Sequence, residues 1–484
     1  MSIDTDIKLL LYRRTKIVAT LGPSSGEPAI IEALIRAGVN VFRLNMAHGD
    51  HDSHRRVYAR VRETSNRLGK LIAVLADLCG PKIRVGAFQN GYIELHRGDN
   101  VTVTTRDVTG GPGLIPSQYR DLARDVAAGS RILLDDGNIE LKVLEISGDD
   151  IYCEVVAGGR LSDHKGMNLP GANVSAPSLT AADRDDAAFA LDLGVDFLAL
   201  SFVRRADDIQ ALRGLIAERG SKVAVVAKIE KPEALHNIVE ILDISDAIMV
   251  ARGDLGVELP PQSVPVAQDQ LIDLARQQRK PVIVATQMLE SMIVHPRPTR
   301  AEVSDVATAV RHGADAVMLS AETAAGQYPV EAVKMMDDII RQTEGYLWQR
   351  GFFGTLRRRT GGQRPYAIED ALSESMAKLS RDLMARAIMV ISKHGRSLAV
   401  MSASRPAAPI LGVCPDYRTS CFATLLWGVI AITVAESELE NPNRLARESV
   451  LAHGLAGKDQ TILVVRGFST NPAENTPSVT VLTV

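Results

Sequence analysis

The feature that most constrains the fold of this chain is a regular alternation of short apolar runs with amphipathic helical patterns. The runs number eight and cover residues 16–20, 39–45, 71–77, 196–202, 223–230, 247–252, 281–286 and 316–320. Helical patterns lie between most of them, as at residues 28–37, 206–218, 262–279, 299–312 and 329–344. Such alternation predicts a parallel sheet, and eight units are the number that closes a (β/α)8 TIM barrel.

An open doubly wound sheet is the competing architecture. It predicts a glycine-rich dinucleotide-binding turn after an early strand. Residues 22–26, which read GPSSG, follow the first run and do not have that pattern. We therefore expect an α/β chain built on the closed barrel.

One interval breaks the alternation, between the third run and a helical pattern at 181–193. It holds short alternating pieces at 101–105, 131–134, 139–146 and 151–156, separated by Asp-Gly and Gly-Asp pairs. These pairs are typical of hairpin turns. We interpret residues 82–176 as an inserted all-β domain that stands at the barrel mouth as a lid.

A second α/β alternation follows a basic, glycine-containing stretch. Helical patterns at 368–383, 396–404, 420–427 and 441–453 alternate with runs at 387–392, 409–413, 429–434, 461–465 and 478–483. The predicted division is barrel (1–81), lid (82–176), barrel (177–346), solvated linker (347–365) and C-terminal α/β domain (366–484).

Charge and hydropathy exclude some function classes. The formal net charge is −3, which gives no electrostatic reason to expect nucleic acid or a membrane surface as partner. No window of eighteen apolar residues occurs, and the first twelve residues lack the apolar segment of a signal peptide. A soluble, cytoplasmic protein is expected.

Polar residues that end the runs indicate the site, because barrel active sites lie where the strands end. Lys228 and Glu230 end the fifth run and, being two apart, point to the same side of a strand. Alone, this pair fits a structural ion pair as well as a site. Other runs end in a similar way, with Arg43 and Asn45, Asp77, Ser201, Arg252-Gly253-Asp254, Thr286 and Ser320, and Lys82 and Arg84 follow the third run.

This set of residues suits phosphoryl transfer. Glu230 and Asp254 fit a divalent cation such as Mg²⁺, which takes one or two carboxylates and fills its other positions with water and substrate oxygens. Arg43, Lys228 and Arg84 fit phosphoryl oxygens. Phosphoryl transfer depends on positioning and electrostatic stabilisation more than on covalent chemistry.

The same residues carry a resemblance. The order of blocks is similar to that of bacterial pyruvate kinases, from about residue 13 to 336: RRTKIVATLGPSS, NVFRLN, HGDHDSH, GPKIRVG, KGMNLPG, AKIEKPEA, IMVARGDLGVELP, VIVATQMLESM, RPTRAEVSDVATAV and MLSAETAAGQYPVEAV. The resemblance implies a TIM barrel with a β lid and an α/β C-terminal domain, assembled as a homotetramer. It implies transfer of the phosphoryl group of phosphoenolpyruvate to ADP, giving pyruvate and ATP in the last step of glycolysis, with Mg²⁺ or Mn²⁺.

The resemblance also implies roles for single residues. Lys228 would stabilise the phosphoryl group in the transition state, and Glu230 and Asp254 would hold the metal. The residues implied to bind phosphoenolpyruvate are Arg43, Ser201, Lys228, Gly253, Asp254 and Thr286, with Thr286 near the face where the enolate is protonated. Those implied to meet the nucleotide are Asn45, His48, Arg84 and Lys165.

The chain departs from the family pattern at its monovalent-cation site, which Asn45, Asp77 and the following residue form in relatives. Ala47 stands where most relatives have Ser, Leu78 where K⁺-dependent relatives have Thr, and Lys82 where they have Glu. The Lys82 ammonium could supply the positive charge that K⁺ brings. We therefore predict a K⁺-independent enzyme; the alternative is that Lys82 only faces solvent.

In the C-terminal domain, a loop follows a strand and opens a helix, where backbone N–H groups suit an anion. Its residues are Ser392, Lys393, His394, Gly395, Arg396 and Ser397. In relatives the matching loop binds a sugar phosphate effector, but this loop has fewer hydroxyls and residues 469–478 do not match the usual closing loop. An allosteric site and a plain helix N-cap both remain open.

Two other function classes fit part of the pattern. Metal-dependent aldolases and lyases that act on pyruvate enolates also use a barrel with paired carboxylates, but they lack the lid and the cations for a nucleotide. A non-catalytic sensor on the same fold should have lost Lys228 or a metal carboxylate, and this chain keeps both.

Overall fold

Eight parallel strands close into a barrel in a computed structural model that describes residues 10–172, 174–353, 366–469, 471, 473 and 475–484. The strand order around the barrel is β1-β16-β15-β14-β13-β12-β3-β2. Their bounds are β1 Lys16–Leu21, β2 Val41–Asn45, β3 Ala73–Asp77, β12 Phe197–Leu200, β13 Ala224–Ile229, β14 Ala247–Ala251, β15 Val282–Ala285 and β16 Ala316–Leu319. Each of the eight apolar runs supplies one strand, so the predicted (β/α)8 architecture is confirmed.

The strands are apolar along their length because both of their faces are buried. In β1, Ile17 and Ala19 pack outward into the cluster shared with the helices, whereas Val18 packs into the barrel interior. All three are fully buried.

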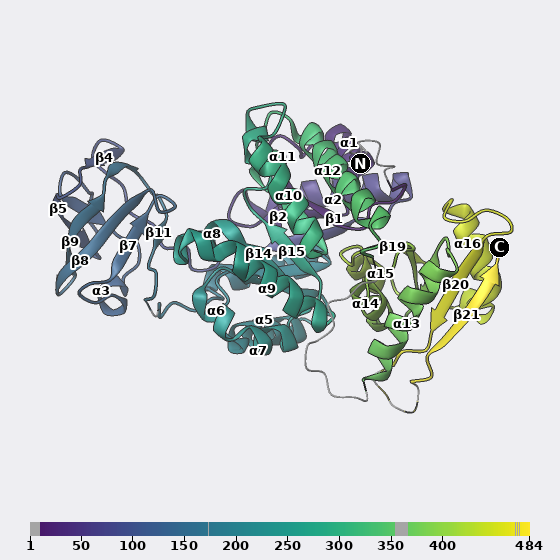
Figure 1. The fold of residues 1–484 in the computed structure, drawn as a ribbon. Coiled ribbons are helices and arrows are strands. Elements are labelled where there is room, and N and C mark those ends of the chain that lie inside the picture. Colours follow the sequence, from purple (N-terminus) through teal and green to yellow (C-terminus); the bar gives the residue numbers. More distant parts are fainter. Residues whose placement is uncertain (1–9, 173, 354–365, 470, 472, 474) are drawn as a thin grey trace.

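Helices cover the outside of the barrel (Figure 1). They are α1 Pro28–Ala37, α2 His51–Leu68, α4 Ala181–Leu193, α5 Ala206–Glu218, α6 Pro232–His236, α7 Ile238–Ile244, α8 Arg252–Glu258, α9 Val264–Gln277, α10 Arg300–His312, α11 Ala321–Ala324 and α12 Pro329–Gln349, with 3₁₀ turns at Pro261–Ser263 and Glu290–Ile293. Local sequence sets several ends: α4 begins at a Thr180–Asp183 capping box and ends at Gly194 in the left-handed conformation.

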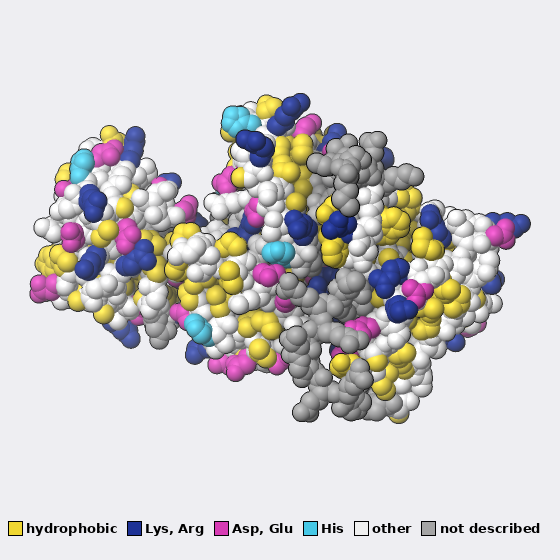
Figure 2. All heavy atoms as spheres, viewed as in Figure 1, with side chains coloured by type: hydrophobic (Ala, Val, Ile, Leu, Met, Phe, Trp, Pro, Cys, Tyr) yellow, Lys and Arg dark blue, Asp and Glu magenta, His cyan; other side chains and the backbone are white. Residues whose placement is uncertain are grey.

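The inserted β domain lies beyond one end of the barrel, and the outline of the molecule is notched between the two (Figures 1 and 2). It contains β4 Tyr92–Leu95, β5 Asn100–Thr104, β6 Leu114–Pro116, α3 Leu122–Asp125, β7 Arg131–Leu134, β8 Ile139–Ser147, β9 Asp150–Ala157, β10 Gly159–Ser162 and β11 Met167–Asn168. Six strands form one sheet, β11-β7-β8-β9-β5-β6, and β10 pairs with β4. This part of the chain has its own buried cluster, which includes Val103, Ile115 and Leu141.

The C-terminal α/β domain lies at the opposite end of the barrel (Figure 1). Its five-stranded sheet has the order β19-β18-β17-β20-β21. The elements are α13 Ile368–Asp382, β17 Ile388–Ile391, α14 Arg396–Ala403, β18 Ile410–Cys414, α15 Tyr417–Ala423, β19 Val429–Thr433, a 3₁₀ turn Glu436–Glu440, α16 Pro442–Ala452, β20 Thr461–Arg466 and β21 Ser478–Thr483.

Helix α15 closes one end of the barrel. Cys421 of α15 and Leu425, just beyond it, belong to the same buried cluster as the barrel interior, and the Phe422 ring lies 6.0 Å from that of Phe197 in β12. The helix begins earlier than the pattern at 420–427 predicts, because the Asp416 side chain accepts a hydrogen bond from Thr419 N and caps it. The open end of the barrel is therefore the end at which the strands finish.

Most of the predicted linker, residues 354–365, lies outside the described residues. Within the described part of the chain, no helix combines the length and the apolar character needed to cross a membrane.

Candidate active site

Lys228 is the centre of a cluster of polar side chains at the open end of the barrel. Its ammonium lies 2.7 Å from Ser201 Oγ, 2.9 Å from Glu230 Oε1 and 3.3 Å from Asp77 Oδ1. Ser201 in turn donates to the carbonyl oxygen of Leu78. The ends of β3, β12 and β13 thus meet on one lysine, and the side chains predicted from their positions at run ends lie together.

Arg43 joins this cluster from β2. Its Nε lies 2.6 Å from Asp77 Oδ2, and its Nη1 donates to Thr20 Oγ1 at 3.1 Å. Asp77 is almost fully buried, and it therefore holds two cations, Arg43 and Lys228, in fixed positions. The cationic ends of both side chains remain near the mouth, where a phosphoryl group could meet them.

The pKa values in the cluster follow from burial and from the neighbouring charges. Burial lowers the pKa of Lys228, but the charges of Asp77 and Glu230 outweigh this and raise it above its usual value. Burial raises the pKa of Asp77, but the charges of Lys228 and Arg43 bring it below its usual value. Lys228 therefore stays charged at neutral pH.

Glu230 and Asp254 form the carboxylate side of the site. The pKa of Glu230 lies above its usual value. Burial is the main cause, the charge of Lys228 opposes it, and the charge of Asp254 adds to it. Glu230 Oε2 accepts a hydrogen bond from Phe202 N at 2.7 Å. Within the described chain, the Asp254 carboxylate has no hydrogen bond and no ion pair, although it borders a pocket.

This carboxylate pair fits a divalent cation. The charge of Asp254 raises the pKa of Glu230, and a hard cation between the two carboxylates would offset this repulsion. No group of three or more His, Cys, Asp and Glu side chains with metal-binding geometry occurs among the described residues. Two carboxylates are enough for a hard divalent cation, which completes its shell with water and substrate oxygens.

Thr286 is held in an unusual backbone conformation. Its φ is 70°, in the left-handed region that β-branched residues rarely adopt. Its Oγ1 accepts from Gly253 N at 2.7 Å, and a Cβ at position 253 would lie 3.4 Å from that oxygen. Thr286, Gly253 and Asp254 therefore form one unit at the ends of β14 and β15.

Arg252 supports this unit. The sequence showed that it stands at the end of a run but predicted no function for it. Its Nη2 donates to the Thr286 carbonyl at 2.6 Å, and its Nη1 pairs with Asp305 of α10 at 2.6 Å. These contacts join residues 34 and 53 positions apart in the chain, so no local pattern could have revealed them.

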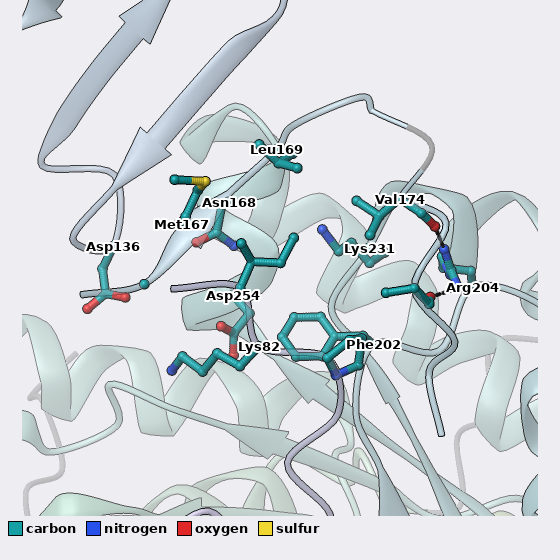
Figure 3. Close-up of a pocket in the computed structure, with 14 residues that line it drawn as sticks. Lys82, Asp136, Met167, Asn168, Leu169, Val174, Phe202, Arg204, Lys231 and Asp254 are labelled. Atoms are coloured by element: carbon teal, nitrogen blue, oxygen red, sulfur yellow. Dashed lines mark hydrogen bonds between the residues drawn. The ribbon is translucent and has the colours of Figure 1, made fainter. Parts of the chain in front are cut away.

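The pocket between barrel and inserted domain is lined from both sides (Figure 3). Lys82, Phe202, Lys231 and Asp254 border it together with Asn168 and other residues of the inserted domain. Lys231 pairs with Glu258 at 2.5 Å, and Asn168 Nδ2 donates to Glu258 at 3.3 Å across the two parts. Lys231 and Glu258 were not predicted; the position of Lys231 directly after Glu230 was the available signal.

Lys82 and Leu78, two of the residues on which the K⁺ prediction depends, lie in different surroundings. The Lys82 ammonium has no hydrogen bond or ion pair within the described residues, and its side chain runs towards Gly166 of the inserted domain. Leu78 is buried in the apolar cluster of the barrel. Asp77, which belongs to the predicted monovalent-cation site with Asn45 and Leu78, is paired with Arg43 and Lys228 rather than with Lys82.

The residues predicted for the nucleotide are more dispersed. Asn45 Oδ1 accepts from Ala47 N at 3.3 Å, and His48 N donates to the Asn45 carbonyl, so both belong to the turn after β2. Arg84 donates to the His164 carbonyl at 3.0 Å. Lys165 pairs with Asp135 inside the inserted domain at 2.7 Å. These contacts place Asn45 and His48 on the barrel and Lys165 on the inserted domain.

The predicted effector loop lies between β17 and α14. Gly395 is the N-cap of α14 with φ 80°, and no side chain caps the helix. Lys393 pairs with Glu436 and Arg396 with Glu369, both at 2.8 Å, and Ser392 and Ser397 are buried. His394 and Gly395 border a cleft of about 830 Å³ that barrel residues also line.

Comparison with known proteins agrees with this architecture. The family model "Pyruvate kinase, barrel domain" matches residues 12–333, and "Pyruvate kinase, alpha/beta domain" matches residues 370–482. The chain belongs to the pyruvate kinase family. Like the other pyruvate kinases it is a phosphotransferase, and the expectation drawn from the sequence blocks is confirmed.

Individual pyruvate kinases match along most of their length. A pyruvate kinase of Agrobacterium vitis is 42% identical over 460 residues, which cover 94% of each chain. That of Mycobacterium intracellulare is 43% identical over 460 residues, or 94% of this chain and 95% of the relative. Pyruvate kinase 2 of Synechocystis is 44% identical over 430 residues, or 88% of this chain and 71% of the relative.

Proposed function

We propose that this pyruvate kinase family member transfers the phosphoryl group of phosphoenolpyruvate to ADP at the cluster around Lys228, giving pyruvate and ATP. The observation that carries the assignment of the site is the convergence of Ser201, Glu230 and Asp77 on Lys228, with Arg43 held by the same Asp77. A cationic pair anchored by one buried carboxylate is preorganised, so it need not reorganise as charge moves during the reaction.

Lys228 and Arg43 neutralise the phosphoryl group in transfer. Arg43 keeps guanidinium donors for a second set of oxygens while Asp77 fixes its Nε. Ser201 and the Gly253 region complete the phosphoenolpyruvate site. Thr286, whose hydroxyl is oriented by Gly253 N and by the Ala285 carbonyl, is proposed to lie next to the carbon at which the enolate is protonated.

Glu230 and Asp254 are proposed to hold Mg²⁺, with Mn²⁺ as an alternative. When bound, the divalent ion supplies positive charge that neutralises phosphoryl and enolate oxygens. The carboxylates position that charge beside Lys228, since Glu230 already contacts the lysine.

The nucleotide is proposed to bind between the barrel and the inserted domain. Asn45 and His48 would meet it from the barrel side, and Arg84 and Lys165 from the inserted domain. Because Lys165 is paired with Asp135, its contribution requires this surface pair to exchange for phosphate oxygens. We propose the divisions 1–81, 82–176, 177–346, 347–365 and 366–484, with 82–176 acting as a lid.

We propose that the enzyme does not require K⁺. Leu78 offers no oxygen from its side chain, Ala47 has no hydroxyl, and Lys82 brings an unpaired ammonium to the pocket that contains Asp254. The loop 392–397 is proposed as a sugar phosphate effector site in a homotetramer, supported by the uncapped helix that it opens.

The test is a coupled assay of ADP-dependent pyruvate formation from phosphoenolpyruvate, run with K⁺ and with a tetraalkylammonium salt in its place. We expect equal activity in both salts. In Lys228→Ala, kcat should fall by about 10²–10³-fold or more, because a transition-state contact is lost, while phosphoenolpyruvate and Mn²⁺ still bind.

Each outcome has a clear meaning. Full activity in Lys228→Ala would overturn the assignment of the site, and collapse without K⁺ would overturn only the K⁺ proposal. Absence of ADP-dependent pyruvate formation, together with cleavage of a carbon–carbon bond that releases pyruvate from another substrate, would favour an aldolase or lyase. Binding of phosphoenolpyruvate without any turnover would favour a sensor.

A further inference from the structure

A second cationic cleft lies between the closed end of the barrel and the C-terminal domain, away from both the Lys228 cluster and the loop 392–397. Its volume is about 900 Å³. Among the described residues that line it, the cations are Arg13, Lys16, Arg36, Lys70 and Arg341, and the one carboxylate is Asp337. Such an excess of one charge in a concave site attracts ligands of the opposite sign.

Among these cations, Lys16, the first residue of β1, is unusual because its ammonium is buried. It is 5% exposed, and its ammonium donates to the carbonyl of Val429 at 2.5 Å. Within the described chain no carboxylate lies within ion-pairing distance of it. A buried ammonium with one hydrogen bond and no counterion is costly unless something else supplies negative charge.

Other cations around the cleft have unused donors. Arg13 is fully engaged, with hydrogen bonds to Asp337, Asn40 and two carbonyls. Arg341 is partly engaged, since its Nη1 lies 3.6 Å from Asp337 Oδ2 while its Nε is buried without a hydrogen-bond partner. The exposed Lys70 ammonium has no partner among the described residues. The site therefore offers free donors at its base and at its rim.

The C-terminal domain contributes the other wall through β19. This strand is at the edge of its sheet, so one of its sides has backbone groups that no neighbouring strand binds. One of them, the Val429 carbonyl, accepts the bond from Lys16. Thr433 also lines the cleft, and its hydroxyl donates to Ser420 Oγ at 2.8 Å. A ligand here would contact both the barrel and the C-terminal domain.

We infer that this cleft binds a small phosphate-bearing anion, with Lys16 as its buried anchor and Lys70 and Arg341 as further contacts. Lysine and arginine together match the charge and geometry of a phosphate group. The ligand is either free phosphate or a phosphate monoester, and these share the chemistry that the cleft recognises. This inference does not depend on the proposed catalytic roles.

The protonation of Lys16 supports the inference. Burial, and next the charge of Arg13, lower its pKa to about 7; Arg14 acts in the same direction, while Glu344 and Asp315 oppose it. A bound dianion would raise this pKa again. Binding near pH 7.5 should therefore be accompanied by proton uptake.

The experiment is isothermal titration calorimetry of the full chain at pH 7.5 with inorganic phosphate and, separately, with glycerol 2-phosphate, in two buffers of different ionisation enthalpy. The variants are Lys16→Met and Lys70→Glu. The control is Lys142→Glu, an equal charge change on an exposed strand of the inserted domain.

We expect Lys70→Glu to weaken one class of binding by about tenfold relative to Lys142→Glu, and Lys16→Met to weaken it further and abolish the proton uptake. Phosphate bound at the active site would form a second class that neither variant changes. Tighter binding of the ester than of phosphate would identify an ester as the ligand, and the reverse order would identify free phosphate.

Equal affinity in wild type, Lys70→Glu and Lys142→Glu would overturn the inference, as would the absence of any phosphate binding outside the active site. If Lys16→Met does not fold, Lys70→Glu decides the question, because its side chain is exposed and its removal does not disturb a buried contact.

Discussion

At the scale of the residue, the site depends on how buried charges share partners. Asp77 binds Arg43 and Lys228 at once, and Lys228 also contacts Glu230. Removing one member of such a set leaves another buried charge unpaired, which costs more than the pair itself contributes. The site also depends on the contact between Arg252 and Thr286. There a charged side chain binds the carbonyl of a residue with a strained backbone instead of pairing with another charge.

We predict that Arg252→Lys lowers kcat by about tenfold or more, with little change in KM for ADP. A lysine cannot bind both Asp305 and the Thr286 carbonyl as a guanidinium fork does, so the proposed position of Thr286 would be lost. Steady-state kinetics together with exchange of the pyruvate methyl protons would report this, since that exchange depends on proton transfer alone.

The matched control is Arg213→Lys, at the other end of β14. Arg213 likewise binds a carbonyl, that of Ile244, and a carboxylate, that of Asp246. Equal losses of kcat and of proton exchange in the two variants would show that Arg252 is only structural.

At the scale of the element, helix ends position the connections of the inserted domain. Thr180 and Asp183 form the capping box of α4, where the chain returns to the barrel. Asp183 Oδ1 also accepts from Gly80 N at 2.9 Å, where the chain leaves it. One buried carboxylate therefore caps a helix and ties together both connections.

We predict that Asp183→Ala lowers stability by about 2 kcal/mol or more, because a cap and a second buried hydrogen bond are lost. Asp50→Ala, which removes the exposed capping box of α2, should cost about 1 kcal/mol. Denaturant midpoints of the two variants, measured side by side, give the comparison. An equal or smaller effect of Asp183→Ala would contradict the proposed link between the two connections.

At the scale of the whole molecule, the C-terminal domain closes one end of the barrel and the inserted domain stands at the other. The first junction contains buried charges: Glu344 accepts hydrogen bonds from Arg14 N and Thr15 N, and Arg405 of the C-terminal domain pairs with Asp315 at 2.9 Å. Lys16 lies in the same junction without such a partner. The free energy of unfolding of the chain should therefore change with pH as Lys16 loses its proton.

We predict that the stability of wild type relative to Lys16→Met rises with pH between 6 and 9. The folded-state pKa of Lys16 is about 7 against an ordinary 10.5. Above pH 7 the unfolded chain therefore binds more protons than the folded chain, and stability increases with pH. Below pH 7 the full cost of burying the charge is present. Thermal unfolding of both proteins across this range, in buffers without phosphate, measures the difference.

A difference in stability that does not change with pH would show that Lys16 titrates near its ordinary value. Lys70→Met, at an exposed site, serves as the control and should show no such trend.

The amino-acid sequence by itself determined the barrel, the inserted β domain and the C-terminal α/β domain. Periodicity and turn residues are local properties, and burial of both strand faces left a continuous apolar run for each of the eight strands. The sequence also placed Lys228 and Glu230 on one side of a strand, and the 2.9 Å contact agrees. Among the described residues, helix α15 begins earlier than predicted because a side-chain cap at Asp416 overrode the apolar pattern, and α12 continues to Gln349, into the predicted linker.

The tertiary structure alone decided which charges share a partner. Asp77 meets Arg43 and Lys228 because three strands end at one mouth, and Arg252 reaches Thr286 because β14 and β15 are neighbours in the barrel. Lys16 at the start of β1 has a backbone carbonyl of β19, that of Val429, as its partner instead of a carboxylate, and only the tertiary structure brings these two residues together. These are contacts between residues far apart in the chain, and their energies depend on burial, which no local pattern of residues contains.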